Sequence, residues 1–517
     1  MNVGTMTLKS GMREASPARF PRAVGWLPCR SVAGHAEVLL VGFDATDPDI
    51  VLRLAATGAM PTVREFLERG TRLDVRNPVG LFVGSVWPSM FTAAPPAEHG
   101  RFAYGRLDPR SYVVRRSRFS DQLRTPFWSG TGLRTAMIDI PYLGDLGDPT
   151  CTQVAGWACH DPVDPGSGGI ASPGSAARAL ERVGSHPIGT DCDRYGRSHA
   201  LGPLRDGLLD GINRKGDLVE SLLGADDWDL FAVTFMEGHC IGHQCWHVHD
   251  PEHPQHDAVQ AAALGDPLVD VYQALDAALG RVVAARAGAG TVLLYFSHGM
   301  GPHYGHTFHL GEILHRLAPL FTTPSRSAKV MERARQDGYR ARRRLRRARG
   351  LPPDGSLRLA DSTLPFFPVP TSDVYGGVRI NLAGRELRGR VQPGPEYEAV
   401  CERLEAELRA IVLCESGEPF VREVVRVDDH HRGPARAAMP DLLVHWNHAV
   451  PVGPVRSPTF GSAEWRYGGH RTGNHRPDGL LLVGGPLLPS EWQQDAIDVT
   501  AIGSGIVSLL GAEPCSG

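Results

Sequence analysis

Four short apolar runs in the first part of the chain have the pattern of buried β-strands. In each run hydrophobic side chains follow one another without polar alternation, which is typical of parallel strands covered on both faces. These four runs are therefore predicted to form one sheet. They are EVLLVGFDATD (37–47), RTAMIDIPY (134–142), WDLFAVTFMEGH (228–239) and TVLLYFSHGM (291–300).

Segments with helical spacing lie between these runs. MPTVREFLERG (60–70) opens with a proline near the first turn and closes at Gly70, and both are common signals of helix boundaries. Residues 204–224 and 267–287 have the spacing and length of longer helices. This alternation predicts an α/β fold, a doubly wound and mostly parallel sheet sandwiched by helices.

Polar side chains follow three of the predicted strands at their carboxyl ends. Asp44 follows the first, the cluster at 237–243 follows the third, and His298 follows the fourth. Ligands of such sheets bind outside the carboxyl ends of the strands. The sequence therefore predicts that these three segments meet at one edge of the sheet and form the functional site.

The alternation stops after residue 324. GYRARRRLRRARG (338–350) predicts an arginine-rich helix, interpreted first as a solvated insertion and alternatively as a surface that attracts an anionic substrate or partner. GGVRINLAGRE (376–386), a helical stretch at 396–412 and EPFVREVVRVDD (418–429) predict a smaller α+β cap.

Two later apolar runs, PDLLVHWN (440–447) and GLLLVGGP (479–486), are expected to return to the main sheet. The resulting division has an N-terminal extension without periodicity, expected to be poorly ordered, and a core that the arginine-rich helix and cap interrupt. The predicted segments are 1–35 for the extension, 36–324 for the first part of the core, 325–435 for the insertion and 436–517 for the second part of the core.

Composition places the chain among ordinary soluble proteins. Of its 517 residues 42% are hydrophobic and 21% charged, and the formal net charge of −3 gives no reason to expect a nucleic-acid partner. No apolar stretch reaches the roughly 18 residues of a membrane span, and the N-terminus has no signal-peptide pattern. We expect a cytoplasmic protein without a membrane partner.

The run EGHCIGHQCWHVHD (237–250) contains the strongest candidate for a metal site. His239 and His243 are four residues apart, so a helix would present both rings on one face. Glu237 precedes them, and GNHRPDG (473–479) offers His475 in a glycine-flanked loop. Three neutral imidazoles are a good zinc site with an open position, where a metal can polarise an ester oxygen.

The histidines that follow, from His247 to His256, are interpreted as mostly structural or exposed. Pro251 and Pro254 prevent a continuous helix there, so these rings cannot all face the same point. The run therefore divides into a metal-facing first part and a second part without that role.

Ser85 is the candidate nucleophile. It lies in FVGSVWPSMFTAAPPAEHG (82–100), just before a predicted helix that contains Pro88. Its hydroxyl would then lie at a helix N-terminus, where backbone N–H groups favour an anion. An ordinary N-cap role explains the same position equally well, and both interpretations stay open.

These motifs, in this order, resemble the alkaline phosphatase superfamily, specifically its type I phosphodiesterase/nucleotide pyrophosphatase branch. The resemblance covers roughly residues 37–310 and 436–512. It rests on VGFDATD, on TAAPPAEHG in place of the family's TGxxPxxHG, on the histidine pair at 239 and 243, and above all on SHGMGP (297–302) and HRPDGLLLVGGP (475–486).

The resemblance implies two metals, commonly zinc, around a Ser or Thr nucleophile. One metal would take Asp44, the nucleophile and His298. The other would take His239, His243 and His475. In this branch the nucleophile attacks phosphorus and the resulting phospho-enzyme is then hydrolysed.

The metal ligands depart from the family pattern in two places. His239 replaces the carboxylate of the family's DxxxH motif, with Glu237 as a possible substitute, and Ser297–His298 replaces an Asp–His pair. The Asp44–His298 site therefore lacks an acid, and we expect it to bind metal weakly. The three-histidine site should hold one metal tightly, with zinc preferred and manganese as an alternative.

The nucleophile position departs as well. The family's nucleophile stands nine residues before the Thr of its TG motif, and counting back from Thr92 leads to Val83. Ser85 is the nearest hydroxyl, and it reaches that position only if the loop shifts by two residues. Ser89 lies inside the predicted helix and is the poorer candidate.

The sequence thus predicts a metal-dependent hydrolase of small-molecule phosphate esters, with a diester or pyrophosphate substrate favoured over a monoester. Two alternatives remain. The chain is either a weakened or inactive relative that binds an anionic ligand or partner, or a biosynthetic tailoring enzyme that uses the same metal for another transfer.

Overall fold

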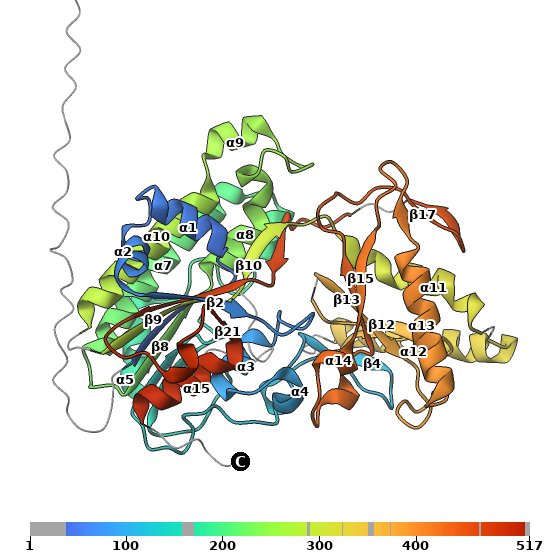
Figure 1. Cartoon of the computed structure of the whole chain (residues 1–517), viewed down its shortest axis with the longest axis horizontal. Helices are drawn as coiled ribbons and strands as arrows, with labels where there is room; N and C mark the ends of the chain where they lie inside the picture. Colours follow the sequence, from blue (N-terminus) through green and yellow to red (C-terminus); the bar gives the residue numbers. More distant parts are fainter. Residues whose placement is uncertain are drawn as a thin grey trace, which may run out of the picture.

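The computed structural model describes residues 38–157, 170–286, 290–322, 324–349, 356–372, 374–464 and 467–511. The expected N-terminal extension at 1–35 lies outside these residues. Figure 1 shows two lobes, the larger built on a twisted sheet between helices and the smaller on a separate antiparallel sheet.

The large lobe contains a nine-stranded sheet in the order β21-β2-β20-β9-β1-β8-β5-β6-β7. Its centre is parallel, because β1 pairs in parallel with both β8 and β9, whereas β20 and β7 run antiparallel to their neighbours. This confirms the predicted α/β class with a mostly parallel sheet. The strands are β1 (Val38–Phe43), β2 (Thr71–Arg76), β5 (Thr135–Ile138), β6 (Cys151–Ala155), β7 (Ile170–Ser172), β8 (Leu230–Phe235), β9 (Thr291–Phe296), β20 (Gly479–Gly484) and β21 (Ala496–Asp498).

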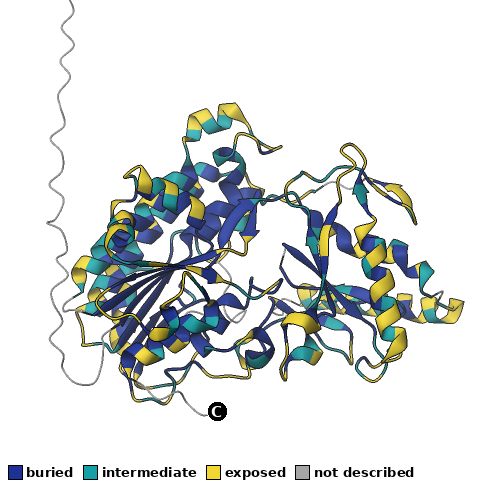
Figure 2. Ribbon diagram, viewed as in Figure 1, coloured by how far each residue is buried: buried dark blue, intermediate teal, exposed yellow. Residues whose placement is uncertain are grey.

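Helices cover both faces of this sheet, and β1 shows why the strand pattern is continuously apolar. Leu39 and Val41 pack on one side, against the cluster with α1, α2, α5, α7, α8 and α10, while Val38 and Leu40 pack on the other, against α3 and α15. Figure 2 shows the sheet buried between the two layers. The helices are α1 (Pro48–Ala56), α2 (Pro61–Arg69), α3 (Val86–Thr92), α4 (Pro96–His99), α5 (Gly174–Val183), α6 (Asp193–Arg197), α7 (Leu201–Leu223), α8 (Glu237–His249), α9 (Ala258–Leu264), α10 (Pro267–Ala285) and α15 (Val499–Leu510).

The carboxyl ends of three central strands lie level with one another. Phe43 pairs in register with Phe235 of β8 and with Phe296 of β9, and the three rings stack at centroid distances of 5.9 and 5.0 Å. The residues that follow these phenylalanines therefore leave the sheet at one edge, as predicted. A short ribbon of β10 (Gly299–Pro302) and β19 (Gly473–Arg476) extends from this edge toward the second lobe.

The smaller lobe contains an antiparallel sheet in the order β12-β13-β16-β15. The strand expected over 440–447 to join the main sheet is β16 of this smaller sheet instead, where it pairs antiparallel with β13 and β15. The expected division at residues 325 and 435 stays a prediction. The elements here are β3 (Gly105–Leu107), β4 (Val113–Arg116), α11 (Leu310–Leu317), α12 (Arg326–Ala348), β11 (Ser356–Leu359), β12 (Phe366–Val369), β13 (Tyr375–Ile380), α13 (Pro395–Arg409), β14 (Val412–Leu413), β15 (Val421–Arg426), α14 (Val427–His430), β16 (Leu442–Trp446), β17 (Val455–Ser457) and β18 (Gly461–Ala463), with short 3-10 turns η2 (His306–His309), η3 (Ala318–Leu320) and η4 (Arg436–Ala438). Two further 3-10 turns, η1 (Phe119–Asp121) and η5 (Ser490–Trp492), pack against the core of the large lobe.

The arginine-rich segment forms the long helix α12, which lies mostly exposed on the smaller lobe (Figure 2). Glu332 is its one buried residue among those described. None of the helices in the described ranges combines the length and apolar character needed to cross a bilayer.

Candidate metal centre and active site

His239, His243 and His475 converge at the edge of the main sheet. One ligand nitrogen from each lies within 4.8 Å of the others, and all three side chains are buried. Helix α8 begins directly after β8, so its first two turns place His239 and His243 on one face. Among the described residues this is the one group of three side chains able to hold a metal ion.

A glycine allows His475 to join the two helical histidines. A Cβ on Gly473 would lie 2.0 Å from the carbonyl oxygen of Gly242, so no other residue fits between β19 and α8 without displacement. The Thr472 N–H donates to the carbonyl of His243 at 2.8 Å. These contacts hold β19 against the helix that carries the other two rings.

The hydrogen bonds of the two helical histidines fix where their protons are. His243 Nδ1 lies 2.8 Å from the Gly473 carbonyl oxygen, which only accepts, so Nδ1 carries a proton. His239 Nδ1 lies 2.7 Å from Asp44 Oδ2. Burial would raise the pKa of Asp44, but the charge and hydrogen bond of His239 hold it well below its usual value, so this carboxylate also accepts.

This arrangement leaves the two Nε2 atoms facing each other at 3.0 Å. With both protons on Nδ1, two lone pairs would meet at that distance, which requires a proton or a metal ion between them. In metal-bound histidines, the ring nitrogen that does not bind the metal usually donates its proton to a carboxylate or a backbone carbonyl, as both Nδ1 atoms do here. The donor set of three buried imidazoles therefore fits a divalent metal of the zinc type.

Asp44 supports this centre through its hydrogen bonds. Oδ2 contacts His239, and Oδ1 accepts from the indole N–H of Trp87 at 2.6 Å and from the Ser297 hydroxyl at 3.0 Å. Three donors therefore already surround the carboxylate that was expected to bind a second metal. The structure gives Asp44 the position of an orienting group for the His239 ring.

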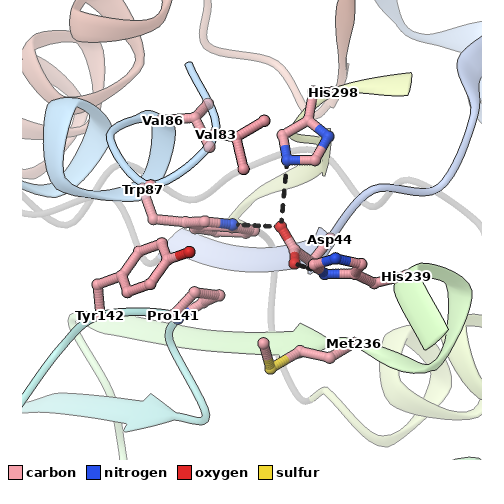
Figure 3. Close-up of a pocket in the computed structure, with 10 residues that line it drawn as sticks. Asp44, Val83, Val86, Trp87, Pro141, Tyr142, Met236, His239 and His298 are labelled. Carbon is pink, nitrogen blue, oxygen red and sulfur yellow. Dashed lines mark hydrogen bonds and ion pairs between the residues drawn. The ribbon is translucent and has the colours of Figure 1, made fainter. Parts of the chain in front are cut away.

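His298 lies on the other side of Asp44, as Figure 3 shows. Its Nε2 is 3.9 Å from Asp44 Oδ1, and its ring centroid is 4.7 Å from that of His475. Burial lowers the pKa of His298, so its ring is neutral at pH 7. His298 is thus brought to the site as expected, next to the three-histidine group but outside it.

Glu237 takes a different place from the one expected. Its carboxylate lies 3.5 Å from Lys215 Nζ and 3.4 Å from His186 Nε2, in a fully buried cluster with Asp139. Burial would raise the pKa of Glu237, but Lys215 lowers it to about 2. Glu237 therefore fixes the first turn of α8 and does not take the place of the family's missing acid.

A small cavity of about 10 Å³ opens beside Asp44 and has room for about one water molecule. Val83 lines this cavity, so the residue found by counting back from Thr92 does face the site, without a hydroxyl. Ser85 does not line it, because its hydroxyl is buried and donates to the Leu81 carbonyl at 2.6 Å. The lining residues (Figure 3) are Asp44, Val83, Gly84, Val86, Trp87, Pro141, Tyr142, Met236, His239 and His298.

Ser89, the other hydroxyl considered, is paired with His99 at 3.0 Å. The Arg101 N–H donates to His99 Nδ1, so the proton of this ring is on Nε2 and is donated to the serine. Burial lowers the pKa of His99 to about 3. The pair is a fixed contact between α3 and α4, since a ring that donates to Ser89 does not activate it.

The later histidines of the run have contacts away from the centre. His247 Nδ1 lies 2.9 Å from the Thr472 hydroxyl, and His249 Nδ1 lies 2.7 Å from Asp266. This agrees with the interpretation that they are structural. Trp87 is buried in the core, and its indole N–H donates to Asp44.

Arg471 is the functional candidate that the sequence did not reveal. One of its terminal nitrogens lies 3.5 Å from His243 Nε2, and the guanidinium also binds Asp193. Its position four residues before His475 was the only available signal. The partner Asp193 lies in a segment without any motif.

The family model of type I phosphodiesterase / nucleotide pyrophosphatase matches residues 38–447, and no curated protein matches the chain. The matched region includes β1, α8 and β9 and ends before β19, which carries His475.

Solved structures with similar folds include two hydrolase types. Phosphonoacetate hydrolase from Sinorhizobium meliloti 1021, in complex with phosphonoformate, is 13% identical, with 92% of this chain and 96% of that chain covered and a TM-score of 0.49. Murine ectonucleotide pyrophosphatase / phosphodiesterase 5, an inactive form in complex with AMP, is 11% identical, with 93% and 96% covered and a TM-score of 0.49.

The family match covers well over half of the chain and includes β1, α8 and β9, the elements that carry or precede Asp44, His239, His243 and His298. The chain therefore belongs to the type I phosphodiesterase/nucleotide pyrophosphatase family of the alkaline phosphatase superfamily, whose members are hydrolases acting on phosphoric ester bonds.

Proposed function

We propose that this hydrolase depends on one divalent metal ion, zinc before manganese, held by His239, His243 and His475. Its substrate would be a small-molecule phosphate ester, a diester or pyrophosphate before a monoester. The observation that carries the proposal is the 3.0 Å approach of the Nε2 atoms of His239 and His243 while both Nδ1 atoms face acceptors.

The residues around the three histidines would prepare them for the ion. Asp44 and the Gly473 carbonyl hold the protons on Nδ1 and so turn the Nε2 lone pairs toward the centre. Trp87 and Ser297 donate to Asp44 Oδ1 and orient the carboxylate. When bound, the ion would supply positive charge against the phosphate oxygens as charge develops on them.

The cavity supports water as the attacking group. Val83 has no hydroxyl to offer, and the Ser85 hydroxyl is directed at Leu81. In a direct reaction the oxygen of water forms a bond to phosphorus while the bond to the leaving oxygen breaks, the water gives up a proton to the leaving oxygen or to solvent, and no phospho-enzyme forms. This differs from the covalent route that the resemblance implies for the family.

The experiment is turnover of bis-p-nitrophenyl phosphate with added Zn²⁺ or Mn²⁺ by the wild type and two variants. His243→Ala should lose activity by about a hundredfold or more, because a metal ligand is removed. Ser85→Ala should stay within about threefold of the wild type, since its hydroxyl faces Leu81. Loss of activity in Ser85→Ala would contradict attack by water and restore Ser85 as the nucleophile.

A second candidate function is binding without turnover. Val83 favours it, because the cavity lacks the hydroxyl with which the family begins its reaction. An anionic ligand or partner would then bind at the centre and remain unchanged. Binding of phosphate without turnover of any phosphate, phosphonate or sulfate ester would favour this candidate over the hydrolase.

A further inference from the structure

Arg471 lies at the solvent side of the three-histidine centre. Its NH1 atom is 3.5 Å from His243 Nε2, the nitrogen that faces His239. The Arg471 side chain is 24% exposed, whereas His239, His243 and His475 are each below 10%. Arg471 therefore connects the buried ligands with solvent.

Asp193 holds the guanidinium in one orientation. Its two carboxylate oxygens accept from Arg471 Nε at 2.9 Å and from Arg471 NH2 at 2.8 Å. Such a two-point contact fixes the plane of the guanidinium. It uses one edge of the group and leaves NH1 directed at the histidines.

Asp193 is itself fixed by the helix that carries the metal ligands. Gln244, the residue after His243, donates to Asp193 Oδ1 at 2.7 Å from its side-chain amide. Asp193 is the first residue of α6, so two helices meet at this carboxylate. The position of Arg471 is thus tied to the same helical turn as His243.

We propose that Arg471 is a substrate-binding residue that donates through NH1 to an anionic phosphoryl oxygen of the ligand at the three-histidine centre, and that Asp193 positions it. This inference rests on the proposed function and names a contact for that site. A cation held within 3.5 Å of a ligand nitrogen is unfavourable beside a bound metal unless an anion lies between them. An oxygen with a full negative charge matches this arrangement, because arginine binds phosphate through charge-assisted hydrogen bonds.

Stability alone does not explain the Arg471–Asp193 pair. Both side chains are more than a fifth exposed, and ion pairs of this exposure contribute little to folding. Removal of Arg471 should therefore leave the protein folded, so a change in ligand affinity can be measured without interference.

The test is calorimetric titration of inorganic phosphate into the zinc-loaded protein. Arg471→Gln should weaken phosphate binding by about 10- to 100-fold, the effect of losing one charge-assisted contact, with zinc stoichiometry unchanged. Arg471→Lys keeps the charge but loses the two-pronged guanidinium, so its phosphate affinity should lie between those of the wild type and Arg471→Gln. Arg476→Gln is the matched control, because it removes a neighbouring exposed arginine of β19 and should change affinity by less than about twofold.

Asp193→Asn tests the positioning role. It should weaken phosphate binding less than Arg471→Gln does, and the double variant should bind no more weakly than Arg471→Gln alone, because Asp193 acts through Arg471. A double variant with the full sum of both effects would overturn the positioning role.

Equal phosphate affinity of Arg471→Gln and the wild type would overturn the inference while leaving the metal-dependent function intact. If the wild type takes up no zinc, the proposed function fails instead. The same pair of proteins is then compared without metal by phosphorus-31 line broadening, where equal broadening overturns the inference and weaker broadening in Arg471→Gln supports it.

Discussion

At the scale of single residues, the exchange of an acid for a histidine at position 239 changes the role of its neighbour. His239 presents Nδ1 to Asp44 and Nε2 to His243, so the Asp44 carboxylate supports a ring where it was expected to bind a metal. The three donors around Asp44 fit this supporting role.

Asp44→Asn should therefore weaken zinc binding by about 10- to 100-fold without abolishing it. An amide accepts the His239 proton less well than a carboxylate, so the ring loses its fixed orientation. The measurement is a competition titration with a zinc chelator. Ser297→Ala is the control, because it removes one donor to Asp44 but keeps the contact with His239, and it should stay within about threefold. Unchanged affinity in Asp44→Asn would contradict the supporting role.

The sequence predicted which residues meet at the site, but not the direction of each side chain. Asp44, His239, His243, His298 and His475 are brought together because strand ends and helical spacing determine where the backbone places them. Glu237 and Ser85 point elsewhere. Glu237 points toward Lys215 of another helix, and the Ser85 hydroxyl points toward the Leu81 carbonyl of its own loop. The spacing of residues in the sequence contains no information about either contact.

At the scale of elements, α8 is anchored by a buried ion pair at its first turn. Lys215 of α7 lies 3.2 Å from Asp139, at the end of β5, and 3.5 Å from Glu237, and it donates to the Thr234 carbonyl of β8 at 2.9 Å. One lysine thus joins the ends of two strands to two helices, at the first turn of the helix that carries His239 and His243.

Lys215→Met should lower the free energy of unfolding by about 3–5 kcal/mol, because it leaves buried carboxylates without their cation. Chemical denaturation measures this. Arg64→Met is the matched control, since Arg64 pairs with Glu68 on an exposed helix face, and there the change should be below about 0.5 kcal/mol. Equal losses in the two variants would show that the buried pair does not anchor α8.

The sequence also predicted the four central strands β1, β5, β8 and β9 and the long helices α7 and α10, and its one misplaced strand shows where such reasoning stops. Three central strands, β1, β8 and β9, are uniformly apolar and separated by long helices. This pattern directly predicts the parallel pairing that the structure has. β16 has the same apolar character but pairs antiparallel with β13 and β15. Apolar character indicates burial in a sheet without indicating which sheet.

At the scale of the whole molecule, several histidines are buried in neutral form between the carboxyl edge of the main sheet and the smaller lobe. Burial lowers the pKa of His303 to about 3, of His306 to about 2, and of His309 and His448 to about 4. His306 is buried and stacks on Phe420 at a ring-centroid distance of 5.2 Å. The folded state therefore resists protonation of these rings.

These lowered pKa values predict that the free energy of unfolding decreases as the pH falls. The unfolded chain binds protons on these histidines near pH 6.5, whereas the folded chain does so only near pH 2–4. Their contribution to stability is complete above about pH 6.5 and is lost as the pH falls toward the folded pKa values. Denaturant unfolding between these limits measures the slope.

His306→Phe keeps an aromatic ring on Phe420 but removes one titrating group. The slope of stability against pH should then decrease by at most about 1.4 kcal/mol per pH unit in the range from pH 3 to 6. A slope equal to that of the wild type would mean that His306 is not held neutral in the folded protein.

The measurement that tests the account most directly is the metal content of the purified chain. After exhaustive dialysis against buffer containing a weak chelator, elemental analysis should find one zinc ion per wild-type chain and close to none in His243→Ala, because three histidines form one tight site. Two tightly held ions per wild-type chain, or zinc retained in His243→Ala, would contradict a single centre formed by His239, His243 and His475.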